Sequence, residues 1–233
     1  MKKYLFVIAA LFIALPLWAS EPKPFTAHYT VSKGSLPIGE MTRSLRVEND
    51  GVYVYESVTE PSGLLGMLVK EKVIERSMAK LVNNHLRVEQ YSYEKSGGNK
   101  PPKKVQLVFD WQERIVKNTV DGETRPMPTA QGLTDILLYQ LALMLDLKQG
   151  KKSLEYAIAD KHKFKTYRFD FAGEETLDTP LGKLKTVKVQ RVPGADGKTT
   201  LIWCAPSLDY LPVRIEQDEK DDGAFSMAIK SME

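Results

Sequence analysis

The sequence predicts a mainly β protein, in which an antiparallel sheet curls into an open barrel or roll around one central α-helix. Two observations predict the sheet: short segments of alternating apolar and polar residues recur along the chain, and glycine- or proline-containing turns separate them. A third observation predicts the helix. Residues 133–147 carry apolar side chains at helical spacing, over a surface wider than one narrow stripe. We therefore expect strands to cover this helix on most sides.

The first nineteen residues have the composition of a secretory signal peptide. Met1-Lys2-Lys3 is positively charged, residues 4–15 are apolar, and Ala19 is a small residue at the expected cleavage position. The apolar run is short for a membrane span, and no cysteine follows it to carry a lipid anchor. We therefore expect cleavage after residue 19, one soluble β-rich domain over residues 20–233, and a periplasmic location.

The net charge argues against a nucleic-acid-binding protein, and the cysteine count excludes a protein stabilised by internal disulfides. Removal of residues 1–19 takes away two of the 33 basic residues and none of the 30 acidic ones, which leaves a net charge of +1. A nearly neutral chain has no electrostatic footprint for nucleic acid. The single cysteine, Cys204, cannot form an internal disulfide, and its apolar neighbours predict a small buried side chain.

Before the helix, the chain has the pattern of an antiparallel meander. The predicted strands are 25–32, 40–48, 52–58, 69–78, 86–93, 105–109 and 114–120. Turns are expected at 33–39, at Asn49-Asp50-Gly51, and at Asp121-Gly122, because these residues favour hairpins. Pro126 and Pro128 are expected to stop any regular element before the helix.

The helix has its own end signals. Thr134 or Thr129 is the expected N-cap, Asp135 suits the positive end of the helix dipole, and Lys148 with Gly150 predicts the end. The strands predicted after it are 153–159, 163–172, 183–192, 199–204, 211–218 and 225–230, with breaks at Gly173, 180–182, 196–197, Pro206 and 222–223.

Residues 61–69 interrupt the strand pattern. The segment is apolar, is flanked by charge, and contains Gly63 and Gly66. One interpretation is a short helix or bend whose leucines close one end of the core. The other is a mobile lip over a cavity, or a patch that faces a membrane. The sequence leaves both open.

Several fragments together resemble one bacterial family. They are Phe109-Asp-Trp111, Gln131-Gly-Leu-Thr-Asp135, Leu138-Tyr-Gln140, Tyr167, Phe169, Gly173-Glu174, Thr179-Pro-Leu-Gly182, Ile202-Trp203, Ala205-Pro206 and Asp209-Tyr-Leu-Pro-Val-Arg214. The chain resembles the bacterial exported domain-of-unknown-function family 3108 over nearly all of residues 25–232. The resemblance implies an exported, β-rich protein of Gram-negative bacteria without a settled activity, and it names no catalytic residue.

The sequence contains no motif that names a reaction. His28, His85 and His162 form no HxH or HExxH pair, so neither a metal nor another cofactor is expected. Four carboxylates, Asp110, Asp135, Glu174 and Asp209, could converge as an acid and base, but each also suits a turn, a helix end or a strand edge. An envelope glycan or ester hydrolase is therefore the weakest hypothesis, and no catalytic residue is assigned.

The favoured hypothesis is a non-enzymatic periplasmic carrier that holds a lipid or other hydrophobic envelope ligand in an apolar groove beside the helix. Its candidate ligand-binding residues are Leu64, Leu65, Met67, Leu68, Trp111, Leu137, Leu141, Trp203 and Arg214. The tryptophans also suit core or corner positions, and Arg214 also suits a structural ion pair with a carboxylate such as Asp209. The alternative is an envelope interaction module that binds a protein partner and has no ligand cavity. We expect a monomer in either case.

Overall fold

The computed structural model describes residues 21–63, 70–98, 101–194, 197–218 and 224–233. Within these residues, fifteen strands form one sheet that does not close on itself, and α2 (Leu138–Lys148) is the α-helix whose bounds are defined. The mainly β prediction is therefore confirmed. All pairs of neighbouring strands are antiparallel except β9 and β10, which run parallel over three residue pairs, so the prediction of a wholly antiparallel sheet is wrong at this edge.

The strand order is β8-β7-β6-β5-β4-β3-β2-β1-β15-β14-β13-β12-β11-β10-β9. The first half comprises β1 (Phe25–Lys33), β2 (Leu36–Val47), β3 (Val52–Pro61), β4 (Lys72–Val82), β5 (His85–Ser96), β6 (Lys103–Asp110), β7 (Ile115–Val120) and β8 (Glu123–Pro128). The second comprises β9 (Leu133–Asp135), β10 (Leu154–Asp160), β11 (Lys163–Thr179), β12 (Gly182–Arg191), β13 (Thr199–Ala205), β14 (Leu211–Asp218) and β15 (Phe225–Met232), with a short 3-10 helix at Pro206–Leu208. Each half is thus a meander, and β1 with β15 joins them.

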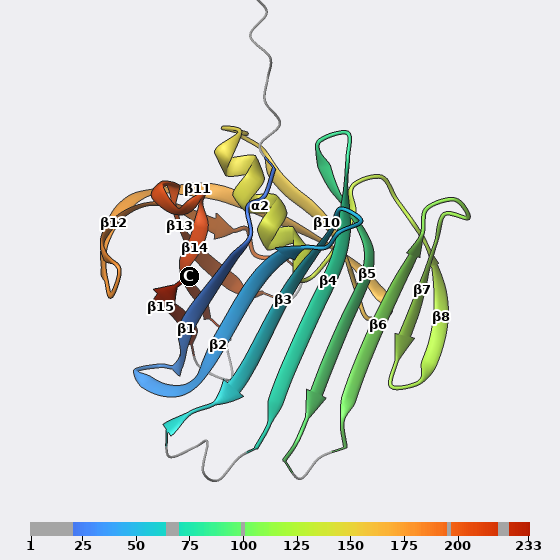
Figure 1. Ribbon diagram of the computed structural model, residues 1–233, viewed down its shortest axis with the longest axis horizontal. Helices are drawn as coiled ribbons and strands as arrows, with labels where there is room; N and C mark the ends of the chain where they lie inside the picture. Colours follow the sequence, from blue (N-terminus) through green and yellow to red (C-terminus); the bar gives the residue numbers. More distant parts are fainter. Residues whose placement is uncertain (1–20, 64–69, 99–100, 195–196, 219–223) are drawn as a thin grey trace, which may run out of the picture.

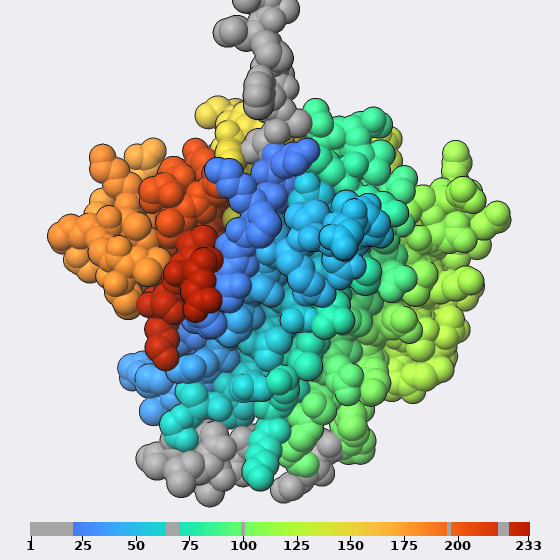
Figure 2. Space-filling view, in the orientation of Figure 1, coloured from blue at the N-terminus to red at the C-terminus, as the bar shows by residue number. Residues whose placement is uncertain are grey.

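The sheet curves so that its two halves face α2 from different sides (Figure 1). Leu138, Leu141 and Met144 belong to the larger apolar cluster, which they share with side chains of β1 to β7. Tyr139 and Leu143 belong to a second cluster with β10 to β13. In the space-filling view, β1 to β4 hide most of the yellow segment that contains the helix (Figure 2). Cover on most sides is what the wide apolar surface of the helix predicted.

The helix begins later than predicted. Leu133–Asp135 is a strand, β9, because its backbone pairs with β10, and the helix starts only at Leu138. Neither Thr129 nor Thr134 caps it. The Asp135 carboxylate accepts the backbone N–H groups of Leu137 at 2.8 Å and of Leu138 at 2.7 Å, so its expected place at the positive end is confirmed. The end at Lys148, with Gly150 at φ +70°, agrees with the prediction.

Other element boundaries also differ from expectation. β2 begins at Leu36, inside the turn expected at 33–39, because Leu36 and Pro37 pair with Lys33 and Ser32 of β1. Residues 123–128 form β8 despite Pro126 and Pro128, because β8 is the edge of the sheet and one side of an edge strand needs no N–H donors. Gly173 does not end its strand. It lies inside β11 at a register shift between Phe171 and Glu174, with φ +103°, and the strand continues to Thr179.

The expected hairpin turns are present at Gly51, with φ +76°, and at Asp121-Gly122, where both φ values are positive. Gly97 has a similar φ of +80°, but a Cβ atom there would lie 1.8 Å from the carbonyl oxygen of Lys70, whereas Gly51 faces open space. A substitution at Gly51 would therefore introduce backbone strain alone, whereas one at Gly97 would add a steric clash.

We expect Gly51→Ala to lower the free energy of unfolding by about 1–2 kcal/mol, the cost of a left-handed conformation for a residue with a Cβ. Gly97→Ala should lower it by about 1–3 kcal/mol more, because the backbone of Lys70 must also move. Urea unfolding of both variants measures the difference. Equal losses would show that the contact between Gly97 and Lys70 is not tight in solution.

Candidate ligand-binding site

Among five well-formed pockets in the described residues, the largest has a volume of about 680 Å³ and an apolar wall that includes Trp111. We call it the Trp111 pocket. One side is the β4–β5 hairpin, residues 82–87, and another is the β6–β7 turn, with Trp111 and Arg114. Residues 129–133, which lead into β9, form the rest. The pocket therefore lies between segments that are distant in the sequence.

Trp111 is held in place by its own turn and by the neighbouring strand. Its indole N–H donates to the Val88 carbonyl oxygen at 2.7 Å, and its ring stacks on Phe109 with centroids 5.8 Å apart. Asp110 stabilises the turn by accepting the N–H groups of Gln112 and Glu113. Aspartate commonly makes such hydrogen bonds in turns, and this role was predicted from the sequence. The half-buried indole is thus a rigid wall.

The opposite wall is held to this turn by the backbone. Thr129 N–H donates to the Arg114 carbonyl oxygen at 2.8 Å, and Leu133 N–H donates to Ala130 at 3.1 Å across a turn that contains Gly132, at φ +75°. Leu133 is buried against the core, whereas Ala130 is exposed at the mouth of the pocket. The shape of the pocket therefore depends on backbone hydrogen bonds as well as on packing.

The ionisable side chains that line the pocket are all basic types. His85, Arg87 and Arg114 line it, and no Asp or Glu does. Arg87 pairs with Glu89 at 2.9 Å, and its guanidinium lies 5.8 Å from the centroid of Trp111. Arg114 forms no ion pair with any described residue. The pocket thus combines an apolar wall with a positively charged rim.

A family model described as "Protein of unknown function (DUF3108)" matches residues 25–230. The chain belongs to this family. Two of the fragments by which the chain resembles DUF3108, Phe109-Asp-Trp111 and Gln131-Gly-Leu-Thr-Asp135, meet at the Trp111 pocket. Nineteen residues lie between Trp111 and Gln131 in the sequence, so the fold brings the two fragments together.

The DUF3108 fold is similar to that of a solved structure described as a beta-barrel-like protein of domain of unknown function DUF1849 from Brucella abortus. The two chains are 9% identical, the match covers 90% of this chain and 97% of the other, and the TM-score is 0.57. At this identity the likeness bears on the fold alone. No curated protein matches the chain.

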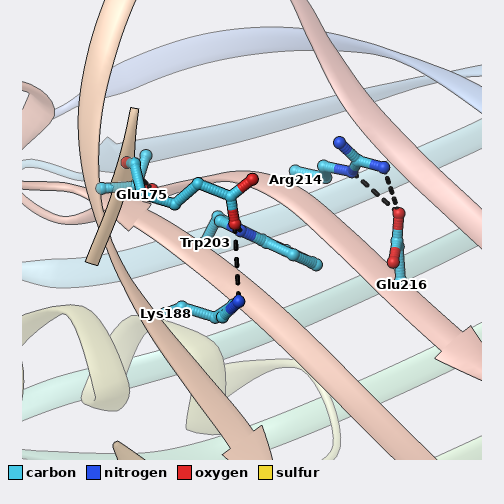
Figure 3. A network of polar contacts seen from close by, with 6 residues as sticks. Glu175, Lys188, Trp203, Arg214 and Glu216 are labelled. Atoms are coloured by element: carbon cyan, nitrogen blue, oxygen red, sulfur yellow. Dashed lines mark hydrogen bonds and ion pairs between the residues drawn. The ribbon is translucent and has the colours of Figure 1, made fainter. Parts of the chain in front are cut away.

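Trp203 and Arg214, from the C-terminal DUF3108 fragments, belong to a polar network on β11 to β14 (Figure 3). The Trp203 indole N–H donates to the Glu175 carboxylate at 2.9 Å, and this hydrogen bond lowers the pKa of Glu175. Lys188 and Arg214 pair with Trp203 across the neighbouring strands. Their charged groups lie 5.6 Å and 5.1 Å from the centroid of the Trp203 ring. Trp203 is buried and lines none of the five pockets.

Arg214 forms an ion pair with Glu216, two residues along the same strand, and Asp209 instead pairs with Lys148 at 2.7 Å and Lys23 at 3.5 Å. The ion-pair interpretation of Arg214 therefore holds with a different partner from the one suggested. Together with Trp203, Arg214 belongs to a polar network within the sheet, away from the Trp111 pocket.

The other predicted ligand residues do not line the Trp111 pocket, or lie outside the described residues. Leu137 is buried in the core, with 1% of its surface exposed, and Leu141 lines a pocket of about 310 Å³ along the flank of α2, beside Phe25 and Met144. The candidates Leu64, Leu65, Met67 and Leu68 lie outside the described residues. Trp111 is thus the predicted ligand residue that lines the largest pocket.

The four carboxylates considered for catalysis lie apart. Asp110 stabilises a turn, Glu174 and Asp209 line two different pockets, and Asp135 lines none of the five. Within the described ranges, no group of three or more His, Cys, Asp or Glu side chains is placed to hold a metal ion. His28 contacts Thr42, whereas His85 lines the Trp111 pocket.

Asp135 follows Leu133, a residue of the Trp111 pocket, by two positions in β9. Its Oδ1 accepts the Ser77 hydroxyl at 2.8 Å as well as the two helix N–H groups, while Oδ2 has no hydrogen-bond partner. Burial raises the pKa of this carboxyl to about 7, the three hydrogen bonds oppose the rise, and the nearby charge of Glu75 adds to it. Asp135 thus links the pocket segment, β4 and α2.

Proposed function

We propose that this DUF3108 protein is a non-enzymatic carrier of the periplasm that binds a lipid or another hydrophobic envelope ligand in the Trp111 pocket. The observation that carries the proposal is the pocket itself, with a volume of about 680 Å³ and a wall built from Trp111, Leu86 and Leu133. Pockets for small molecules typically have volumes of roughly 300–1,000 Å³ and predominantly apolar linings with a few polar groups.

The architecture supports a carrier. A rigid, open roll of strands around one helix can leave space at its open end without loss of the core, because the core clusters lie on both sides of the helix. Trp111 is fixed by a hydrogen bond and by ring stacking, so the wall costs little conformational entropy to order when a ligand binds.

Export is part of the proposal. The signal-peptide pattern of residues 1–19 and the absence of a following cysteine support a periplasmic protein without a lipid anchor. Among the described residues, no helix has both the length and the apolar composition needed to cross a membrane.

Filling the pocket tests the proposal. Ala130→Trp places a large side chain at the exposed mouth, and Ala224→Trp places the same side chain at an exposed position that lines none of the five pockets. We expect the wild-type protein to bind a fluorescent apolar probe that extracted envelope lipids displace. Ala130→Trp should weaken probe binding by about tenfold or more, which corresponds to ~1.4 kcal/mol, and Ala224→Trp should not.

Native mass spectrometry of the protein purified from the envelope fraction gives an independent readout, since a carried lipid should appear as added mass. Absence of any added mass, together with a wild-type protein that binds no apolar probe, would overturn the carrier proposal. Equal probe binding by Ala130→Trp and the wild type would place the ligand elsewhere.

A further inference from the structure

The rim of the Trp111 pocket carries more positive charge than its hydrophobic role requires. Three basic side chains, His85, Arg87 and Arg114, line it with no acidic residue among them. Elsewhere on this sheet, basic side chains commonly have carboxylate partners, as Lys72 has Glu60 and Arg76 has Glu56. A pocket with an apolar wall and, at its rim, an arginine without an ion-pair partner among the described residues is complementary to a ligand with an apolar chain and a negative end.

Arg114 provides a second, independent observation. Its backbone has φ +56°, the left-handed region, and it lies at the end of the four-residue turn between β6 and β7. A long side chain is uncommon there, and glycine would adopt this conformation without strain. The chain thus keeps a strained position for a residue whose guanidinium has no ion-pair partner among the described residues. Lys161 shares the left-handed backbone, so what distinguishes Arg114 is that its strained position also lines the Trp111 pocket.

The three basic groups are not equally available. The guanidinium of Arg87 is shared with Glu89, through Nε at 3.0 Å and Nη2 at 2.9 Å, and lies over Trp111. The acidic residues of the adjacent turn are Asp110, which is engaged by backbone N–H groups, and Glu113, and neither lines the pocket. Arg114 is therefore the cation most free to pair with a ligand.

We infer that the ligand of the Trp111 pocket is an anionic amphiphile, whose apolar chain contacts Trp111 and whose carboxylate or phosphate oxygens bind Arg114. This inference rests on the proposed function and specifies its ligand class. The planar guanidinium can donate two parallel hydrogen bonds to either head group, which favours both over a neutral hydroxyl. Arg87 adds positive charge beside it, and the His85 ring adds a further polar group.

The backbone of Arg114 provides a test in which fold and binding respond in opposite directions. Arg114→Gly removes the cation and relieves the left-handed strain, so its melting temperature should equal or exceed that of the wild type. Lys161→Gly is the matched control, because Lys161 is also basic, also exposed and also left-handed at φ +50°, but does not line this pocket. Arg114→Lys retains the positive charge but cannot donate two parallel hydrogen bonds from a planar group.

Calorimetric titration would use dodecyl phosphate, dodecanoate, neutral monododecanoyl glycerol and inorganic phosphate. We expect the wild type to bind the two anionic amphiphiles about tenfold or more tightly than the neutral one, and Arg114→Gly to lose most of that preference. Lys161→Gly should keep the preference, and Arg114→Lys should keep part of it.

The outcomes separate this inference from the carrier proposal. If the wild type binds all three amphiphiles equally, or if Arg114→Gly keeps the anionic preference, the inference is wrong while the pocket remains a hydrophobic site. If no amphiphile binds, the proposed function itself fails. If inorganic phosphate binds as tightly as dodecyl phosphate, the rim is a simple anion site and the amphiphile is excluded.

Discussion

Asp135→Ala should destabilise the protein by about 3–5 kcal/mol, because it removes the acceptor of three buried hydrogen bonds and each buried donor left unpaired costs roughly 1–3 kcal/mol. The three donors are the Ser77 hydroxyl and the N–H groups of Leu137 and Leu138, and all three residues are buried. At roughly 2–4 °C per kcal/mol for a chain of this size, the melting temperature should fall by about 10 °C. Thermal unfolding followed by circular dichroism measures the loss.

Asp135→Asn should behave differently, because Oδ1 keeps its three donors and only the unpartnered Oδ2 is replaced. In the folded protein, burial raises the pKa of Asp135 to about 7, while an unfolded aspartate has a pKa of about 3.9. Between these values the folded state holds a proton that the unfolded state has lost. The contribution of Asp135 to stability therefore falls as the pH rises from about 4 to about 7, and it is constant above that range.

The difference in unfolding free energy between Asp135→Asn and the wild type isolates this effect. It should grow in favour of the amide by about 2–4 kcal/mol between pH 4 and pH 7, since each pKa unit corresponds to about 1.4 kcal/mol. Burial also raises the pKa of Glu75, with the same sign, and this contribution is present in both proteins, so the difference reports Asp135 together with its coupling to Glu75.

Asp110→Asn controls for the replacement of a carboxyl group by an amide. Asp110 also accepts two backbone N–H groups, but in an exposed turn. Urea unfolding at several pH values gives the profiles. A constant difference between Asp135→Asn and the wild type from pH 4 to pH 7 would show that the Asp135 carboxyl does not bind a proton preferentially in the folded state.

Asp135 also shows how far the sequence could predict this region. Its place at the positive end of the helix could be predicted, because that depends on neighbours in the sequence. The strand at Leu133–Asp135 could not, since it exists only through pairing with residues 157–159 of β10. The same limit explains β8, where Pro126 and Pro128 are acceptable because the strand is an edge, a property of strand order and not of local composition.

Only part of the candidate site could be predicted, again because the rest depends on residues that are distant in the sequence. Trp111 was a candidate ligand-binding residue in the sequence, and it lines the pocket. Arg114 was missed because a charged residue near a turn ordinarily faces solvent, and nothing local reveals its left-handed backbone or its lack of an ion pair. Trp203 and Arg214 were grouped with Trp111 by residue type, but their cross-strand pairing with Lys188 and Ala228 places them elsewhere in the sheet.

One signal in the sequence was available but unused. Arg43 alternates with Met41 and Leu45, which places all three on one face of β2, and in the structure that face is the inner one. Arg43 is 5% exposed and donates to the Gln140 side-chain oxygen of α2 at 2.5 Å. It forms no ion pair with a described residue, so a positive charge lies in the core with a neutral amide as its acceptor.

This arrangement predicts that the charge lowers stability unless its acceptor is present. Gln140→Leu should reduce the free energy of unfolding by about 2–4 kcal/mol, because a hydrogen bond to a charged group is lost and the guanidinium remains buried. Arg43→Met with Gln140→Leu should recover most of that loss and bring the protein within about 1 kcal/mol of the wild type, or above it, since well-packed apolar residues can replace buried charged groups without loss.

The comparison with an exposed arginine of the same strand decides whether burial is the cause. Arg46→Met changes the same side chain on the outer face, where Arg46 contacts Glu48 at 3.5 Å, and should alter stability by no more than about 0.5 kcal/mol. If the double variant is as unstable as Gln140→Leu alone, the cost comes from lost packing around α2 rather than from the buried charge. If it recovers, Arg43 and Gln140 are retained at no gain in stability, and their value lies in fixing one orientation of the helix against β2.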